Sequence, residues 1–204
     1  MDKRQIVITA LAAVAGFAAV ALSTAYIVSK RQAGTGIGVA SVGGPFELVD
    51  DTGAAVTERT LAGKPSVMYF GYTFCPDVCP TTLLDMSHWI KELGPDADKL
   101  NYVFVTVDPE RDTPQLMHSY LSSFDHHIRG FTGTPEQVAK IAREYRVYFK
   151  KVPTDDGGYL MDHSAVIYLM GASGNLVGVI PYQEDDATAL TKLRNLANAG
   201  APSS

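Results

Sequence analysis

Two cysteines, Cys75 and Cys79, lie in the stretch FGYTFCPDVCP (residues 70–80), and they are the only cysteines among the 204 residues. Three residues separate them, and a proline follows each one. Two thiols at this spacing can close a disulfide, exchange with the disulfide of another protein, or bind a metal ion as thiolates. The pair is therefore the first candidate site in the chain.

The blander roles for this pair are a structural bridge and a closed zinc site. A disulfide around five residues would add little stability to a domain of this size, and two small buried thiols would have no chemistry at all. A structural zinc site usually requires four ligands, with a second Cys or His pair at short spacing, and we find no such pair in the sequence. A redox motif and an open metal site remain as the alternatives.

His163 is the histidine that we single out as a third ligand. It stands in LMDHSAVIYLM (residues 160–170), at the entry to a predicted strand. Two thiolates and one imidazole form a soft set that suits Cu(I), and Cu(II) could be held with a further oxygen or water ligand. Met161 is expected in the core. The other four histidines are expected to be surface or capping residues: His88, His118, His126 and His127.

The elements that must position these residues follow from the hydrophobic pattern and the helix-start signals. Apolar runs predict strands at Val67–Tyr72, Tyr102–Val107, Ala165–Met170 and Leu176–Ile180, the last two forming a hairpin around GASGN. Helices are expected over Pro80–Leu93, Pro114–Phe124, Pro135–Tyr145 and Asp185–Asn198. Strands that alternate with helices predict an α/β layer fold with the sheet covered on both faces.

The thiols are expected at a junction between a strand and a helix. Pro80 disfavours the α conformation at Cys79 and is a good first helical residue, so we expect the helix to begin at Pro80 with Cys79 in the capping place. The partial positive charge of a helix N-terminus stabilises a thiolate there and lowers its pKa.

Residues 6–28 carry no charge over 23 positions, which is long enough to span a hydrocarbon core of about 30 Å. A cleaved signal peptide is the rival interpretation, but its apolar region is shorter. We therefore expect a short N-terminal segment (1–5), a transmembrane helix (6–28), a small-residue tether (29–41) and one domain (42–204). The five-residue lead leaves no room for a transit peptide, which favours a bacterial inner-membrane protein.

The charge of the chain bears on its partners. The sequence has 17 Lys and Arg against 22 Asp and Glu, and its net charge is -5. Four of the basic residues flank the apolar segment evenly, two on each side, so they do not decide the topology and they leave the domain still more acidic. Nucleic acid and anionic lipid should repel such a domain. Proteins and metal ions are the expected partners.

Four motifs together resemble the Sco/SenC family of membrane-anchored copper-binding proteins. They are YFGYTFCPDVCP, VTVDPERDT, FTGTPEQVAKIAREYRVYF and the Asp-His-Ser of MDHSAVIYL. The resemblance covers most of residues 42–198, in order, without a departure at the motif positions. A bare CxxxC would be weak evidence, whereas its combination with DPERDT and the later DHS is specific.

The resemblance implies a thioredoxin-like fold with a central mixed sheet, and copper ligands at Cys75, Cys79 and His163. In thioredoxin-like proteins the place of His163 usually holds a cis-proline beside the thiols, so we expect the sheet to deliver this imidazole to them. It further implies one copper ion, Cu(I) or Cu(II), a domain on the periplasmic side, and a periplasmic copper donor protein. The resemblance assigns no metal-binding role to Asp77, Asp108 or Asp162, which we expect to be turn and cap residues.

The function implied is a copper chaperone that delivers copper to the binuclear copper centre of cytochrome c oxidase subunit II. The alternative is a thiol-disulfide oxidoreductase in which Cys75 and Cys79 form a redox-active pair that reduces the client's cysteines before metallation. A redox or copper sensor is a third interpretation, but no signalling module is visible in the sequence.

Overall fold

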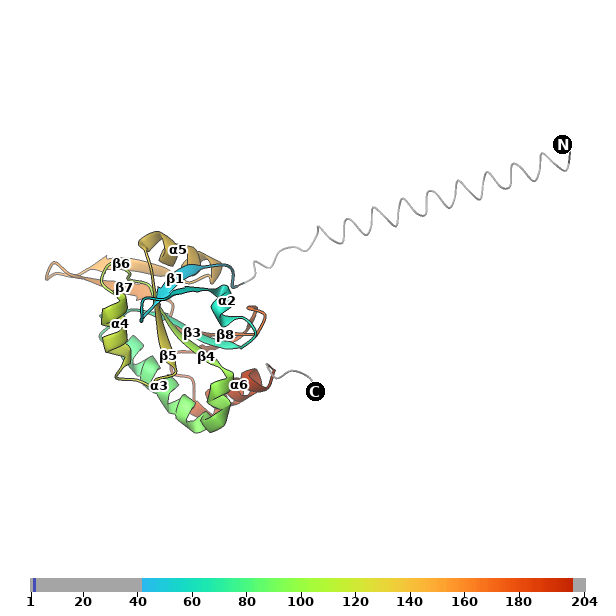
Figure 1. Ribbon diagram of the computed structural model, residues 1–204. Helices are drawn as coiled ribbons and strands as arrows, with labels where there is room; N and C mark the ends of the chain where they lie inside the picture. The colour runs from blue at the N-terminus through green and yellow to red at the C-terminus, as the bar shows by residue number, and fades with distance from the viewer. Residues whose placement is uncertain (1, 3–41, 200–204) are drawn as a thin grey trace. The chain divides into compact units, whose positions relative to one another are not determined.

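The computed structural model describes residue 2 and residues 42–199, and the domain formed by residues 42–199 is shown in Figure 1. The predicted membrane helix and tether (6–41) lie outside the described residues. Among the residues that are described, no helix has both the length and the apolar character to cross a membrane.

The described part of the domain contains one large sheet and one small sheet. The large sheet has seven strands in the order β2-β1-β5-β4-β3-β8-β9, and β6 pairs only with β7. The strands are β1 (Glu47–Asp50), β2 (Ala55–Thr57), β3 (Ser66–Gly71), β4 (Asn101–Thr106), β5 (Ile128–Thr132), β6 (Phe149–Pro153), β7 (Tyr159–His163), β8 (Val166–Met170) and β9 (Leu176–Pro181). The helices are α2 (Glu58–Leu61), α3 (Val78–Leu93), the 3-10 helix η1 (Gly94–Lys99), α4 (Pro114–Leu121), α5 (Pro135–Glu144) and α6 (Asp186–Ala199).

The centre of the large sheet is parallel and its flanks are antiparallel. β3 pairs in parallel with β4, and β4 with β5, while β8 joins β3 antiparallel and continues into β9. Every residue of β3 is buried, as in a sheet with both faces covered. The predicted mixed sheet and the β8–β9 hairpin are confirmed.

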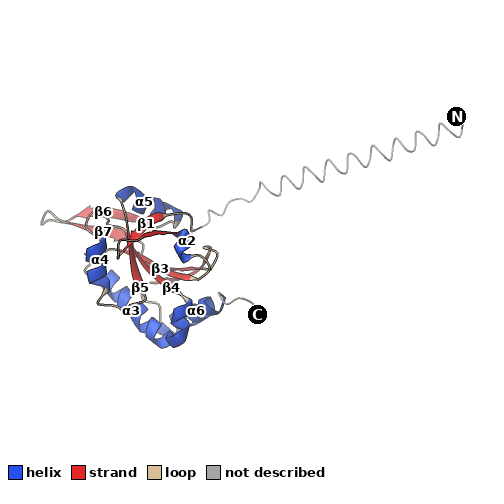
Figure 2. Cartoon of the chain, in the orientation of Figure 1, coloured by secondary structure: helices blue, strands red, loops and turns tan. Residues whose placement is uncertain are grey.

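Neighbouring residues of β3 show the two layers that cover the sheet. Tyr69 packs toward Phe104 with ring centroids 5.9 Å apart, and Phe104 in turn meets Tyr120 of α4. Phe70 points the other way and meets Tyr145, which follows α5. Helices α3 and α6 pack against each other in one layer, with α5 beside β1 in the other (Figure 2). The predicted helices on both faces are confirmed.

The predicted helix starts at α4 and α5 are confirmed by their caps. The Thr113 side chain accepts from the backbone N–H of Leu116, and the Thr134 side chain accepts from that of Gln137. Both helices begin with Pro at the first position, where the missing N–H costs nothing.

Five strands were not predicted: β1, β2, β5, β6 and β7. The sequence pattern also placed β3 and β4 one residue too far along the chain. These shifts do not alter the architecture, because the parallel pairing of Gly71 with Thr106 brings the carboxyl ends of both strands to one edge of the sheet. The cysteine motif and the DPERDT motif follow directly from that edge.

Candidate metal centre

The two cysteines lie where β3 passes into α3. Cys75 is in the loop, half-buried, and Cys79 is fully buried in the first turn of α3. The prediction that the helix begins at Pro80 is wrong, because α3 begins at Val78. Pro80 is accommodated because first-turn N–H groups make no bond within the helix.

The helix N-terminus is capped by sulfur rather than by an oxygen. Asp77 occupies the cap position, but its side chain makes no capping bond. Instead, the backbone N–H of Cys79 donates to the Sγ atom of Cys75 at 3.4 Å. The capping role expected for the Cys79 thiol is therefore wrong, and the sulfur of Cys75 serves in its place.

The two sulfur atoms differ strongly in acidity. A hydrogen bond from the Cys79 thiol lowers the pKa of Cys75 to about 3, against the opposing effect of burial. The same interaction with Cys75, together with burial, raises the pKa of Cys79. At neutral pH the metal-free pair therefore holds one thiolate, on the more exposed Cys75, and one proton, on Cys79.

His163 completes the site from a different sheet. It is the last residue of β7, which pairs with β6 in the two-stranded sheet, with His163 opposite Phe149. The prediction that the large sheet would deliver this imidazole is therefore wrong. The described residues contain no cis peptide bond, and two residues separate His163 from the start of β8.

The imidazole of His163 is oriented toward the sulfur atoms. Its Nδ1 lies 3.1 Å from the carbonyl oxygen of Ser164, and its Nε2 lies 3.5 Å from the Sγ atom of Cys79. A proton on Nδ1, donated to the carbonyl, leaves the lone pair of Nε2 directed at the thiols. The rings of Tyr69 and Tyr72 meet the imidazole edge-on, with centroids 6.3 and 5.8 Å away.

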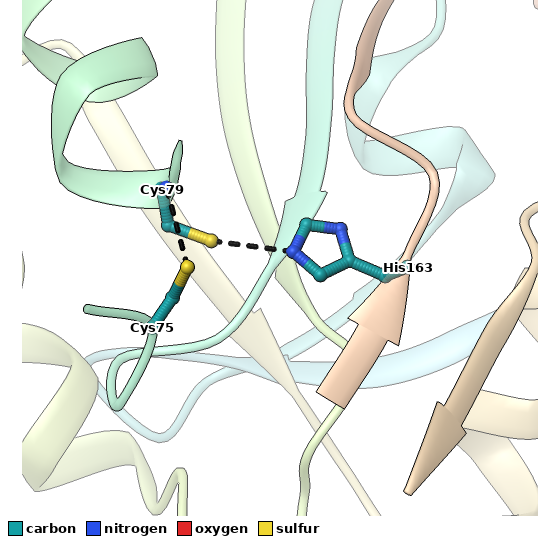
Figure 3. Close-up of side chains that lie close together, drawn as sticks. All are labelled: Cys75, Cys79 and His163. Carbon is teal, nitrogen blue, oxygen red and sulfur yellow. Dashed lines mark hydrogen bonds between the residues drawn. The ribbon is translucent and has the colours of Figure 1, made fainter. Parts of the chain in front are cut away.

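The three side chains converge on one point, as Figure 3 shows. The ligand atoms of Cys75, Cys79 and His163 all lie within 4.8 Å of one another. Two ligands at about 2.0 and 2.3 Å from a tetrahedral ion are separated by about 3.5 Å. The observed separation of Nε2 and Sγ is therefore suitable for a shared ion, and the S₂N donor set is a soft one.

Two residues that the sequence did not single out shape the pocket of Cys79. The buried hydroxyl of Tyr69 donates to the Cys79 Sγ atom at 3.6 Å. A Cβ atom at Gly71 would lie 2.8 Å from that sulfur and 2.7 Å from the ring of Phe104. Glycine is thus required at this position for the sulfur to sit against the sheet.

A buried carboxylate of the DPERDT motif (residues 108–113) holds the cysteine loop, which is the segment between β3 and α3 that contains Cys75. The carboxylate of Asp112 accepts from the backbone N–H of Thr73 at 3.0 Å and from its hydroxyl at 2.6 Å. It also accepts from the hydroxyl of Thr106 at 2.6 Å. Burial raises the pKa of Asp112 although these hydrogen bonds oppose the shift. The motif thus holds the loop at the end of β3.

A second buried carboxylate of this motif links it to the strand of His163. Asp108 accepts from Arg111 and from the hydroxyl of Tyr159, which begins β7, at 2.9 Å. The guanidinium of Arg111 lies 3.8 Å from the Tyr159 ring centroid and donates to the Tyr159 carbonyl. Asp108 is thus more than the turn residue that we expected. Asp162 is exposed and lies inside β7, opposite Lys150, so the turn or cap role expected for it is wrong.

The expectations for Met161, His88 and His118 are confirmed. Met161 is buried. His88 faces Asp186 and His118 faces Asp51 on the surface. Asp125, His126 and His127 form a second group whose ligand atoms lie within 4.8 Å of one another. This last group shares no residue with the thiol site.

Comparison with known proteins finds relatives that match most of this chain. The model of the SCO1/SenC family matches residues 35–198. A curated relative from Arabidopsis thaliana, Protein SCO1 homolog 1, mitochondrial, is 44% identical over 145 residues, which are 71% of this chain and 43% of the relative. The chain spans about half the length of the curated relatives that it matches first.

Solved structures match over most of the described domain. Bradyrhizobium japonicum ScoI with copper bound is 51% identical, with a TM-score of 0.72 over 76% of this chain and 99% of that one. Yeast Sco1 with copper bound is 38% identical, with a TM-score of 0.73 over 79% of this chain and 91% of that one. The predicted α/β fold with a mixed central sheet is therefore that of these copper-bound relatives.

Proposed function

Because the chain belongs to the SCO1/SenC family, we propose that it binds one copper ion through Cys75, Cys79 and His163 and acts as a copper chaperone. The observation that carries this proposal is the convergence of two thiols and one imidazole within 4.8 Å. The copper-bound state of two relatives with the same fold supports the choice of metal.

The client that we propose is cytochrome c oxidase subunit II, at its binuclear copper centre, as the family resemblance implies. A periplasmic copper donor protein would load the chain. Nucleic acid is not a partner that we propose, because the domain is acidic. Copper is the cargo in this scheme, so the site must release it as well as bind it.

The burial of the ligands suggests an order for the transfer. Cys75 and His163 are half-buried, whereas Cys79 is fully buried behind them. An incoming thiolate from the client reaches the ion on the exposed side and displaces Cys75 or His163 first. Cys79 leaves last, so the ion remains bound to one protein or the other throughout. A low coordination number leaves room for the incoming ligand.

A second candidate function, thiol-disulfide exchange, rests on the unequal acidity of the cysteines. The Cys75 thiolate would attack a client disulfide, forming a mixed disulfide and releasing the client's first thiolate. Cys79 would then lose its proton and attack the Cys75 sulfur, releasing the second client thiol. The chain ends with a Cys75–Cys79 disulfide and the client is reduced by two electrons. Exchange of this kind does not require His163.

His163 therefore separates the two functions in one experiment. Reduced, copper-loaded full chain is mixed with purified apo subunit II, and copper and thiols in both proteins are followed by mass spectrometry. We expect copper to move to the client while Cys75 and Cys79 end as thiols. His163→Ala should bind copper more weakly and transfer less of it, yet still reduce an oxidised client.

The matched control is His88→Ala, which removes an exposed imidazole whose Nε2 lies 3.8 Å from a carboxylate oxygen of Asp186. It should transfer copper as the wild type does. Full copper loading, with an unchanged Cu(II)-thiolate absorption band, in a natively stable His163→Ala variant would exclude His163 as a ligand. Reduction of an oxidised client by the wild type, without transfer of copper to it, would favour the reductase.

We further propose that residues 6–28 anchor the chain in a bacterial inner membrane and that the domain lies on the periplasmic side. The support is the uncharged run of 23 residues and the family resemblance. A reporter that folds only in the periplasm, fused after Ser204, should be active in cells that express the full chain. Activity of a cytoplasm-only reporter at the same position would refute this topology and the delivery scheme with it.

A further inference from the structure

The side chains of Asp125, His126 and His127 form a cluster at the opposite end of the large sheet from the thiols. They immediately precede β5, whose first residue, Ile128, pairs with Tyr102 near the start of β4. The cysteine loop instead follows the carboxyl end of β3, which pairs with the end of β4. The length of β4 separates the two groups, so no ion could be shared between them.

One carboxylate oxygen lies between the two imidazoles of this cluster. Oδ1 of Asp125 is 2.6 Å from Nδ1 of His127 and 3.7 Å from Nδ1 of His126. The two rings lie against each other with centroids 4.2 Å apart. The 2.6 Å contact is a hydrogen bond, whereas ligand atoms of a tetrahedral ion with bonds of about 2.0 Å are about 3.3 Å apart. A bound ion would therefore replace this proton and widen the contact by about 0.7 Å.

The far side of the His127 ring faces a second carboxylate, which could orient the ring if it bound a metal ion. Its Nε2 is 3.1 Å from Oδ1 of Asp98, in η1, 29 residues away in the chain. A histidine that binds a metal through one ring nitrogen almost always donates the N–H of the other to a carboxylate or carbonyl, which fixes the ring. Asp98 is placed to do this while Nδ1 faces Asp125 and His126.

An unpaired hydroxyl lies beside the cluster as well. Tyr102 is only 2% exposed, and its hydroxyl has no hydrogen-bond partner among the described residues. Its ring meets the ring of His127 edge-on, with centroids 6.3 Å apart. Buried hydroxyls are usually hydrogen-bonded, so a group that this structure does not include, such as water on a bound ion, would satisfy it.

We propose that His126, His127 and Asp125 bind one divalent cation of the borderline class, such as Zn²⁺ or Cu²⁺, with Asp98 positioning His127. Two imidazoles and a carboxylate form an N₂O donor set, which suits these divalent ions and lacks the soft sulfur that Cu(I) prefers. His126 is 86% exposed in its side chain, so solvent or a second molecule can supply the remaining ligand. The site is thus open and exchangeable.

The test uses untagged full-length protein in which Cys75→Ser and Cys79→Ser remove the thiol site. Calorimetric titration with Zn²⁺ should show one equivalent bound. His126→Ala and His127→Ala in this background should each weaken that binding by at least about 10-fold, and Asp98→Asn should weaken it by about 10- to 100-fold without changing the stoichiometry. His88→Ala, which removes another exposed histidine, should leave it unchanged.

Titration with Cu²⁺ allows the same site to be measured by spectroscopy. In the thiol-free background it should give an electron paramagnetic resonance signal with nitrogen coupling and no thiolate charge-transfer band. Should the double variant fail to fold, the reduced wild type answers the question, because His126→Ala should lower its total bound zinc by one equivalent. Absence of zinc binding, or zinc binding by the His126→Ala and His127→Ala variants that is as tight as in the parent protein, would overturn the proposal without affecting the thiol site.

Discussion

Cys75→Ser and Cys79→Ser should each abolish tight Cu(I) binding. Each change removes one of two thiolates, and a single thiolate with His163 no longer forms the soft chelate. Structural Zn²⁺ sites in zinc-finger peptides bind with about 10–16 kcal/mol, and a comparable energy shared among three ligands implies a loss of at least about 100-fold in Cu(I) affinity per ligand removed. Competition with a chromophoric Cu(I) chelator measures this loss directly.

The variants need one control for loss of the fold and another for the position of the copper site. Thermal melting should show that Cys75→Ser retains the fold, since Cys75 is half-buried, whereas Cys79→Ser alters a fully buried position that receives the hydrogen bond of Tyr69. His126→Ala should bind Cu(I) as the wild type does. Wild-type Cu(I) affinity in either cysteine variant would place the copper site elsewhere and leave the cysteines as a redox motif alone.

Oxidation of the cysteine pair should remove copper binding entirely. A disulfide between Cys75 and Cys79 consumes both thiolates, so reduced protein should bind one copper ion at this site and oxidised protein essentially none. Copper at 100 times its dissociation constant adds about 2.7 kcal/mol to the free energy of unfolding of the reduced form. For a domain of this size that shift corresponds to a rise in Tm of about 5–10 °C.

Alkylation provides a second measurement of the same linkage. Bound copper should slow the reaction of both cysteines together. Without copper, the half-buried Cys75 should react faster than the fully buried Cys79. The comparison is made by mass spectrometry on reduced protein with and without Cu(I). Equal Cu(I) affinity of the oxidised and reduced forms would contradict a thiolate site at this turn.

The sequence predicts the centre of this fold better than its edges. The strands β3 and β4 are buried on both faces, so they appear as continuous apolar runs that any periodicity analysis detects. β6 is exposed over four of its five residues and contains two lysines, so it has no such signal. β5 contains an arginine and a glycine, and β2 has three residues.

The same limit applies to the site. The spacing of Cys75 and Cys79 is local, so their proximity could be predicted, but the route by which His163 reaches them depends on the unpredicted β6–β7 pairing. The role of Asp112 could not be inferred either, because its partner Thr73 lies 39 residues away. From the sequence alone, the carboxylates of the DPERDT motif could equally belong to exposed turn residues, because only the folded sheet brings them against the cysteine loop.

The small sheet that carries His163 determines which parts of the chain a bound ion would connect. An ion held by Cys79 and His163 would join positions 84 residues apart, whereas a Cys75–Cys79 disulfide joins positions four residues apart. By the loop-closure model, cross-links of these spans raise the free energy of the unfolded chain, through its lost entropy, by about 4.5 and about 2 kcal/mol at 25 °C. Copper would thus form a long-range cross-link in this domain, whereas the disulfide would form only a local one. Release of the ion would remove the link between β7 and the helix that carries Cys79, while Arg111, Asp108 and Tyr159 still connect β7 to the cysteine edge of the sheet.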